Sequence, residues 1–134
     1  MRNRESEYAR KRQWLSEGKC RECGNINIVR SSCCERCYLI KISSKRLGSG
    51  KYWKQIKEKL IEQKYKCALT GDNLTFDNME LDHILSPKRN GTNDLLNVRW
   101  VTKKANRLKQ DLTDKELIIL MQKILTNFKN KGIA

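Results

Sequence analysis

Two C-x-x-C pairs near the start of the chain constrain its fold more than any other feature. Cys20 and Cys23 form the first pair and Cys34 and Cys37 the second, with ten residues between the pairs. Without a secretory signal, cysteines at this spacing predict a metal site before disulfides. Four thiolates can hold a zinc ion tetrahedrally, at about 2.3 Å each. Because the single histidine lies far downstream, we expect a closed, structural site of four cysteines that folds this segment and does not catalyse.

Alternatives stay open at this site. Cys33 adjoins Cys34 and can replace it as the third ligand. Disulfides or free thiols are the other interpretation of the clustered cysteines. Cys67 has no partner at a metal-binding spacing, and we expect it to be a small buried hydrophobic residue.

The charge of the chain points to a polyanionic partner. Its 134 residues include 29 Lys and Arg against 15 Asp and Glu, a net charge of +14. Such an excess favours phosphates, because neutralising them releases condensed counterions. At this charge on a chain of this size, we expect a nucleic-acid partner rather than a surface that is merely over-basic. A membrane surface is the weaker candidate, because no lipidation motif accompanies the charge.

The apolar content suits a modest core. Hydrophobic residues make up 38% of the chain, and no run approaches the roughly eighteen apolar residues of a spanning helix. The first residues, MRNRESEYARKRQW, lack the apolar centre of a signal peptide. We therefore expect a protein that stays in the compartment where it is made, the cytoplasm, and is not secreted.

The periodicity predicts an α+β fold. We expect a short basic helix over residues 4–16, a Ser/Gly-rich linker over 43–51 and a helix over 51–64 whose buried face carries Trp53, Ile56, Leu60 and Ile61. A strand ending near His83, a polar loop with Pro87 and Gly91, and a second strand over NVRWV should follow.

Two helices complete the expected order. Thr102 can cap a helix over TKKANRLKQD, and Thr113 with Glu116 forms a capping box before a strong helix over 113–129. The apolar stripe of that last helix is most simply core; it comprises Leu117, Met121, Ile124, Leu125 and Phe128. Trp53 and Trp100 are also expected in the core rather than as platforms for bases.

Polar residues around the lone histidine suggest a catalytic site. Asp82 precedes His83, Asn97 should open the second strand beside it, and Asn106 lies on the following helix. A neutral imidazole can take a proton from water, while carboxylate and amide oxygens can hold a hard divalent ion. Metal-assisted hydrolysis of a phosphodiester needs this set. Basic residues that can meet phosphates crowd the same stretch: Lys88, Arg89, Arg99, Lys103, Lys104, Arg107 and Lys109.

The segments LDHI, NVRWV and ANRLK resemble, in type and order, the motif of the HNH endonucleases, in its His-Asn-Asn form. Residues 50–110 carry the resemblance, and CALTG and the helix before it are also similar to members of the group. The resemblance implies a ββα-metal core. Similar modules occur in phage and intron endonucleases and in RNA-guided nucleases, so a phage or mobile-element origin suits the chain.

The resemblance also implies a role for each residue. His83 would be the general base, and Asp82 and Asn106 would hold one Mg²⁺ or Mn²⁺ ion that also binds the scissile phosphate. Asn97 would fix the loop and help to orient the histidine, and Lys109 would hold phosphate. Many members have a histidine at the third motif position, where this chain has Asn106, and an amide oxygen favours Mg²⁺ or Mn²⁺ over Zn²⁺. Neighbouring strand residues point to opposite faces, so Asp82 and His83 can share a site only if the strand ends or twists there.

The expected protein is thus a zinc-binding module over residues 1–45 followed by a nuclease domain over 46–134, with its core at 66–110. Its expected activity is metal-dependent cleavage of double-stranded DNA, by nicking or by double-strand breakage. The alternative is a zinc-ribbon DNA-binding regulator whose HNH-like half is inactive, and RNA is a further possible substrate. Target sequence and oligomeric state are not determined by these residues, because phosphate contacts position and base contacts specify.

Overall fold

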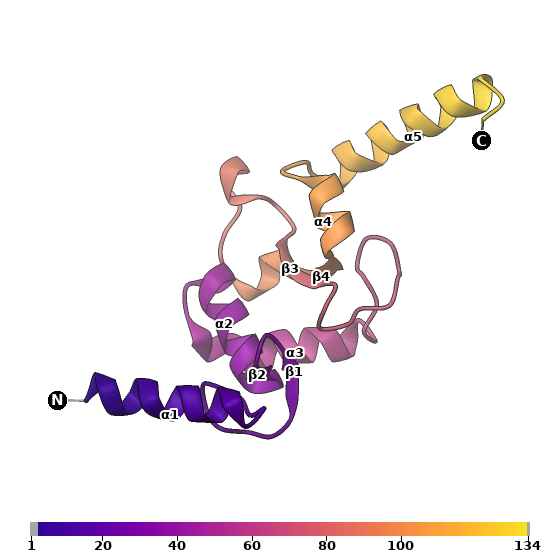
Figure 1. Ribbon diagram of the computed structural model, residues 1–134. Coiled ribbons are helices and arrows are strands. Elements are labelled where there is room, and N and C mark those ends of the chain that lie inside the picture. The colour runs from indigo at the N-terminus through magenta and orange to yellow at the C-terminus, as the bar shows by residue number, and fades with distance from the viewer. Residues whose placement is uncertain (1–2, 134) are drawn as a thin grey trace.

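Helices and two small antiparallel sheets make up the part of the chain that the structure describes, residues 3–133 (Figure 1). In this computed structural model the elements follow one another as α1 (Arg4–Ser16), β1 (Ile28–Arg30), β2 (Cys33–Cys34), α2 (Glu35–Leu47), α3 (Trp53–Glu62), β3 (Met79–His83), β4 (Val98–Thr102), α4 (Lys103–Lys109) and α5 (Asp114–Asn130). The expected α+β class is confirmed. Within residues 3–133, no helix has the length and apolar character needed to cross a membrane.

An antiparallel hairpin of β3 and β4 lies between the helices (Figure 1). Its register runs from Met79 opposite Thr102 to His83 opposite Val98. Thr102 then ends the strand and caps α4, because its side-chain oxygen accepts a hydrogen bond from the backbone N–H of Ala105 at 3.2 Å. The strand, loop, strand and helix follow in the order that the sequence predicts.

The core lies where α3 packs on this hairpin. Ile56 and Leu60 of α3 and Leu81 and Trp100 of the strands have at most 1% of their surface exposed. Trp100 also donates its indole N–H to the carbonyl oxygen of Ile56 at 2.7 Å, so its polar atom is satisfied inside the core. Ile61, which we expected on the buried face, is 55% exposed.

Helix α2 corrects the predicted linker. Residues 43–47 form its last turns, and Gly48 ends it in the left-handed conformation that favours glycine (φ 77°). Ser43 is buried and donates its hydroxyl to the carbonyl oxygen of Ser49. Leu39 and Leu47 of this helix belong to the same core as α3 and the hairpin. The boundary expected between residues 45 and 46 therefore falls inside a helix that spans from the cysteine segment to the core.

Helix α5 corrects a second expectation. Thr113 caps it as predicted, accepting a hydrogen bond from the backbone N–H of Glu116 at 3.2 Å. However, only Leu117 of its apolar stripe is buried. The other members, Met121, Ile124, Leu125 and Phe128, are between 40% and 49% exposed, because α5 projects away from the body of the protein (Figure 1).

Candidate functional site

The four cysteines of the two pairs converge. Cys20 and Cys23 lie in the turn after α1, Cys34 ends β2, and Cys37 is in the first turn of α2. Their sulfur atoms all lie within 4.8 Å of one another, and the Sγ atoms of Cys23 and Cys34 are 3.6 Å apart. Corners of a tetrahedron with 2.3 Å bonds are about 3.8 Å apart, whereas a disulfide needs about 2.05 Å. The cluster of free thiols therefore has the size of a metal site, and within residues 3–133 it alone brings three or more Cys, His, Asp or Glu together in this way.

The structure decides between the two candidates for the third thiol. Cys34 contributes to the cluster, whereas the sulfur of Cys33 accepts a hydrogen bond from the ammonium of Lys41 at 3.3 Å. Cys67 is 3% exposed, as expected, and its sulfur accepts the backbone N–H of Thr102 at 3.3 Å.

The surroundings of the cluster affect how readily its thiols ionise. Burial opposes ionisation of Cys20, yet hydrogen bonds from nearby backbone groups, those of Cys34, Glu22 and Cys23, outweigh it and lower the pKa of this thiol to about 6. Burial and the neighbouring cysteines instead raise the pKa of Cys37. Thiolates are the metal-binding form, so a cation among them is what would allow all four to ionise together. The donor set of four sulfurs fits zinc.

A second site surrounds the lone histidine. A pocket of about 150 Å³ is lined by Arg46, Leu81, Asp82, His83, Ser86, Pro87, Asn106 and Gln110. Asp82 and His83 both reach it because His83 is the last residue of β3, where the regular alternation of faces ends. Asn106 comes from α4, which packs beside β3. Three of the four residues expected at the site thus line one cavity.

The imidazole of His83 is held by the end of α2. Its Nε2 atom lies 3.1 Å from the carbonyl oxygen of Arg46. A carbonyl oxygen can only accept, so this contact requires a hydrogen on Nε2 and leaves the lone pair of a neutral ring on Nδ1. A helix that begins at the cysteine cluster therefore orients the histidine.

Asp82 lies in a buried ion-pair network. Lys109 is 0% exposed, and its ammonium lies 3.0 and 3.3 Å from the two carboxylate oxygens of Asp82 and 2.7 Å from the carbonyl oxygen of His83. The Nε atom of Arg99 lies 3.5 Å from a carboxylate oxygen of Asp82. The other two guanidinium nitrogens of Arg99 donate to the carboxylate of Asp114 at 2.6 and 2.7 Å. Lys109, which we expected at a phosphate, has no surface in contact with solvent. It instead holds Asp82 in the wall of the pocket. Arg99, also expected at a phosphate, is largely buried among carboxylates.

Asn106 has a partner that the sequence did not suggest. Its side-chain amide donates to the carboxylate of Glu80 at 2.7 Å. Glu80 precedes Asp82 by two residues on β3 and shares its face. The amide nitrogen is thereby directed to Glu80, which leaves the amide oxygen as the atom that can bind a cation.

Asn97 fastens the loop between the two strands. Its amide donates to the carbonyl oxygens of Leu85 and Thr92 at 2.9 and 2.8 Å, and its oxygen accepts the backbone N–H of Leu85 at 2.9 Å. Gly91 lies in the same loop, where a Cβ atom would clash with the carbonyl oxygen of Leu85. Asn97 does not line the histidine pocket; it holds the chain that follows His83.

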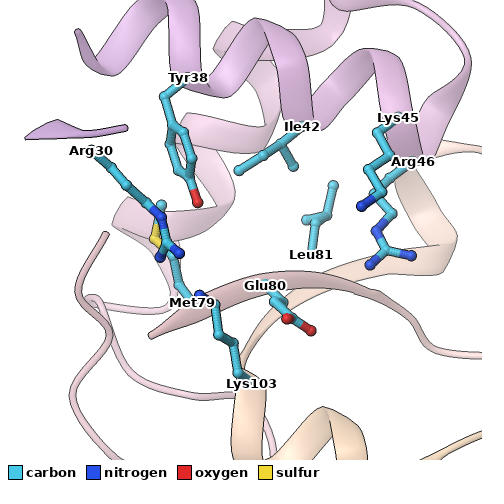
Figure 2. Close-up of a pocket in the computed structure, with 9 residues that line it drawn as sticks. All are labelled: Arg30, Tyr38, Ile42, Lys45, Arg46, Met79, Glu80, Leu81 and Lys103. Atoms are coloured by element: carbon cyan, nitrogen blue, oxygen red, sulfur yellow. The ribbon is translucent and has the colours of Figure 1, made fainter. Parts of the chain in front are cut away.

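A cationic pocket adjoins the histidine pocket and shares Arg46 and Leu81 with it. It encloses about 270 Å³, and Figure 2 shows Tyr38, Ile42, Lys45 and Arg46 of α2 pointing toward β3, with Glu80 and Lys103 on the facing side. Arg30 of β1 closes one end and donates to the carbonyl oxygens of Phe76 and Asp77 at 2.8 and 2.7 Å. The sequence did not mark Arg30, Lys45 or Arg46, because they lie before residue 50 and only the packing of α2 brings them beside β3.

The other basic residues expected at phosphates remain on the surface. Lys88 and Arg89 lie on the loop after β3, where Arg89 pairs with Glu116 of α5 at 2.5 Å. Lys103, Lys104 and Arg107 of α4 line a surface hollow whose other walls include two carboxylates, Asp72 and Asp77. Positive side chains therefore flank both ends of the hairpin.

The chain matches no protein-family model, no curated protein and no solved structure with which it was compared.

Proposed function

We propose that this protein is a divalent-metal-dependent DNA endonuclease of the HNH type, with a structural zinc ion on Cys20, Cys23, Cys34 and Cys37. The observation that supports it most is the pocket that Asp82, His83 and Asn106 line together. In this proposal β3, β4 and α4 are the ββα-metal core, and α2 is the part of the zinc module that supports it.

The residues would divide the work as follows. His83, with Nε2–H directed to the carbonyl oxygen of Arg46, takes a proton from the attacking water at Nδ1. The oxygens of Asp82 and Asn106 would hold Mg²⁺ or Mn²⁺, which fits their hard donor character. When bound, such an ion stabilises negative charge on the phosphate and on the leaving oxygen. Lys109 positions the Asp82 carboxylate before the ion binds, and the ion would share that carboxylate with it.

The DNA substrate would approach the histidine pocket over a positively charged surface. Lys45 and Arg46 line the cationic pocket beside the histidine pocket, and Lys103 lines its opposite wall (Figure 2). A DNA strand that crosses both pockets would place one phosphate at His83 and a neighbouring phosphate at these side chains. Electrostatic attraction of this kind supplies most non-specific affinity for DNA.

One observation favours the alternative, a zinc-dependent DNA-binding regulator without catalysis. Asp82 is already paired with Lys109, and Asn106 with Glu80. A divalent ion must therefore compete with Lys109 for the carboxylate, and an inactive protein would keep the same contacts.

Cleavage of supercoiled plasmid separates the two. Wild type is compared with Asn106→Ala, first in EDTA concentrations that leave tightly bound zinc in place and then with added Mg²⁺ or Mn²⁺, with RNA in parallel. We expect metal-dependent nicking or linearisation by wild type and a loss of at least about 100-fold in the variant, whose DNA binding and circular dichroism should be unchanged. Salt-sensitive DNA binding by wild type without cleavage in any metal would contradict the nuclease and support the regulator.

A further inference from the structure

The exposed face of α5 carries a pattern that suits a second copy of itself. We define the α5 stripe as Leu117, Ile118, Met121, Ile124, Leu125 and Phe128. Apart from Leu117, its members are 40% to 55% exposed and lie on one side of the helix. Contiguous apolar patches of this length are uncommon on monomeric proteins and usually mark an interface.

The spacing along the centre of the stripe is the same from either end. Leu117, Met121, Ile124 and Phe128 follow the alternating intervals of four and three residues that are typical of a helix-pairing seam. Asp114, the first residue of α5, and Lys131, the residue that caps its end, extend the seam by three residues at each end. An antiparallel copy would bring Leu117 opposite the partner's Phe128, and Met121 opposite the partner's Ile124. Asp114, which is paired with Arg99 of its own chain but keeps 40% of its side chain exposed, would lie opposite the partner's Lys131.

The charges at the two ends of α5 favour an antiparallel pair over a parallel one. In an antiparallel pair the acid at one end of each helix meets the base at the other end of its partner. In a parallel pair Asp114 would meet the partner's Asp114, and Lys131 the partner's Lys131, which is unfavourable. Antiparallel helices also place the positive end of each helix dipole beside the negative end of the other.

An apolar pocket at the base of α5 would receive the end of the partner helix. It encloses about 260 Å³; Leu108, Leu117, Ile118 and Met121 supply apolar lining, and Arg99 and Asp114 also line it. Leu108 is itself 59% exposed at this pocket. The partner's Phe128, opposite Leu117, would lie at its mouth.

We propose that α5 mediates an antiparallel homodimer of this protein through the α5 stripe, closed at both ends by Asp114 and the partner's Lys131. The proposal does not depend on nuclease activity. A helix of 17 residues is about 25 Å long, so the interface is smaller than the roughly 800 Å² that each partner buries in a standard complex. We therefore expect a dissociation constant on the order of micromolar.

Sedimentation equilibrium of the full chain tests the dimer. Wild type should move from monomer to twice the monomer mass as its concentration rises through the micromolar range. Met121→Glu places a charge in the seam and should remain a monomer. Ile119→Glu is the matched control, because Ile119 is 44% exposed but lies outside the stripe, and it should dimerise like wild type. Circular dichroism verifies that both variants keep their helices.

A charge reversal tests the direction. Lys131→Glu should weaken the antiparallel dimer about tenfold or more, since it meets the partner's Asp114, whereas in a parallel dimer it only exchanges one like-charged pair for another. Wild type that stays monomeric at about 100 µM, a concentration well above the expected dissociation constant, equal effects of Met121→Glu and Ile119→Glu, or a dimer that Lys131→Glu does not weaken would each overturn the proposal.

Discussion

At the residue scale, the contact between Lys109 and Asp82 determines how the histidine pocket is built. A buried lysine is stable only when its charge is matched, and here the partner is a carboxylate that also lines the pocket. The spacing of Asp82, His83, Asn97 and Asn106 was sufficient to predict that most of them would meet at one site. Sequence spacing could not predict that Lys109 would be inward-facing, because this depends on the angle at which α4 packs on β3.

Removing Lys109 should therefore destabilise the fold. Lys109→Met leaves the Asp82 carboxylate buried without its nearest counter-charge, which costs about 3–5 kcal/mol in comparable cases. Lys104→Met, on the exposed side of the same helix, should change the free energy of unfolding by less than about 0.5 kcal/mol. Urea denaturation of the three proteins makes the comparison, and equal stabilities would show that the ion pair contributes nothing.

At the element scale, α2 connects the two candidate sites. Cys34 caps its start, Cys37 lies in its first turn, and its end lies beside His83, whose ring contacts the carbonyl oxygen of Arg46. The paired cysteines were recognisable from sequence because metal ligation requires fixed spacings. Helix α2 was not, because Ser43, Ser44 and Gly48 are typical of linkers; burial of Ser43 and a left-handed Gly48 give them structural roles that depend on the fold.

Zinc binding should depend on the cysteine that the structure selects. Cys34→Ser should lower the zinc content well below one ion per chain and loosen α2, because it removes one of four ligands. Cys33→Ser should keep one zinc per chain, since Cys33 contacts Lys41 instead. Metal analysis of the purified proteins is the measurement. Zinc loss in Cys33→Ser with retention in Cys34→Ser would reverse the assignment.

The base of α5 should show a pH-dependent anchor. The hydrogen bonds from Arg99 hold the pKa of Asp114 below its usual value. This contribution to stability is present above the unfolded pKa, about 4, and is lost as the pH falls through the lower folded pKa. Asp114→Asn should therefore be less stable than wild type at pH 7, and the difference should shrink toward pH 3. Asp111→Asn, an exposed control, should follow wild type, and denaturation at several pH values would reveal any departure.

At the scale of the whole molecule, a cationic pocket and an exposed apolar helix face are the two surfaces that invite partners. Composition alone predicted a polyanionic partner, and the structure adds that Lys45 and Arg46 join Lys103 beside the histidine pocket. The sequence also predicted the amphipathic character of α5, but periodicity cannot tell whether the buried partner of a helix belongs to the same chain. The expectation that its stripe was core was wrong, because four of its five members are exposed in this chain.

DNA binding should weaken in a salt-dependent way when this charge is removed. Lys45→Gln with Arg46→Gln should lower the slope of log affinity against log salt by roughly 2, one unit for each phosphate contact. Lys123→Gln, which removes a charge that lines neither pocket, is the control and should leave the slope nearer to wild type. Titrations of a labelled duplex at several salt concentrations give the slopes; an unchanged slope in the double variant would remove the cationic pocket from the DNA path.

The most direct test of the central claim is the rate of plasmid cleavage in Mg²⁺ or Mn²⁺ by wild type, His83→Ala and Ile84→Ala. Ile84 follows the histidine and is exposed, so its variant controls for disturbance of the strand end. If His83 is the general base, His83→Ala should lose about 10²- to 10⁴-fold in rate with DNA binding intact, added imidazole should restore part of it, and Ile84→Ala should cut like wild type. Cleavage by His83→Ala at the wild-type rate would contradict the account.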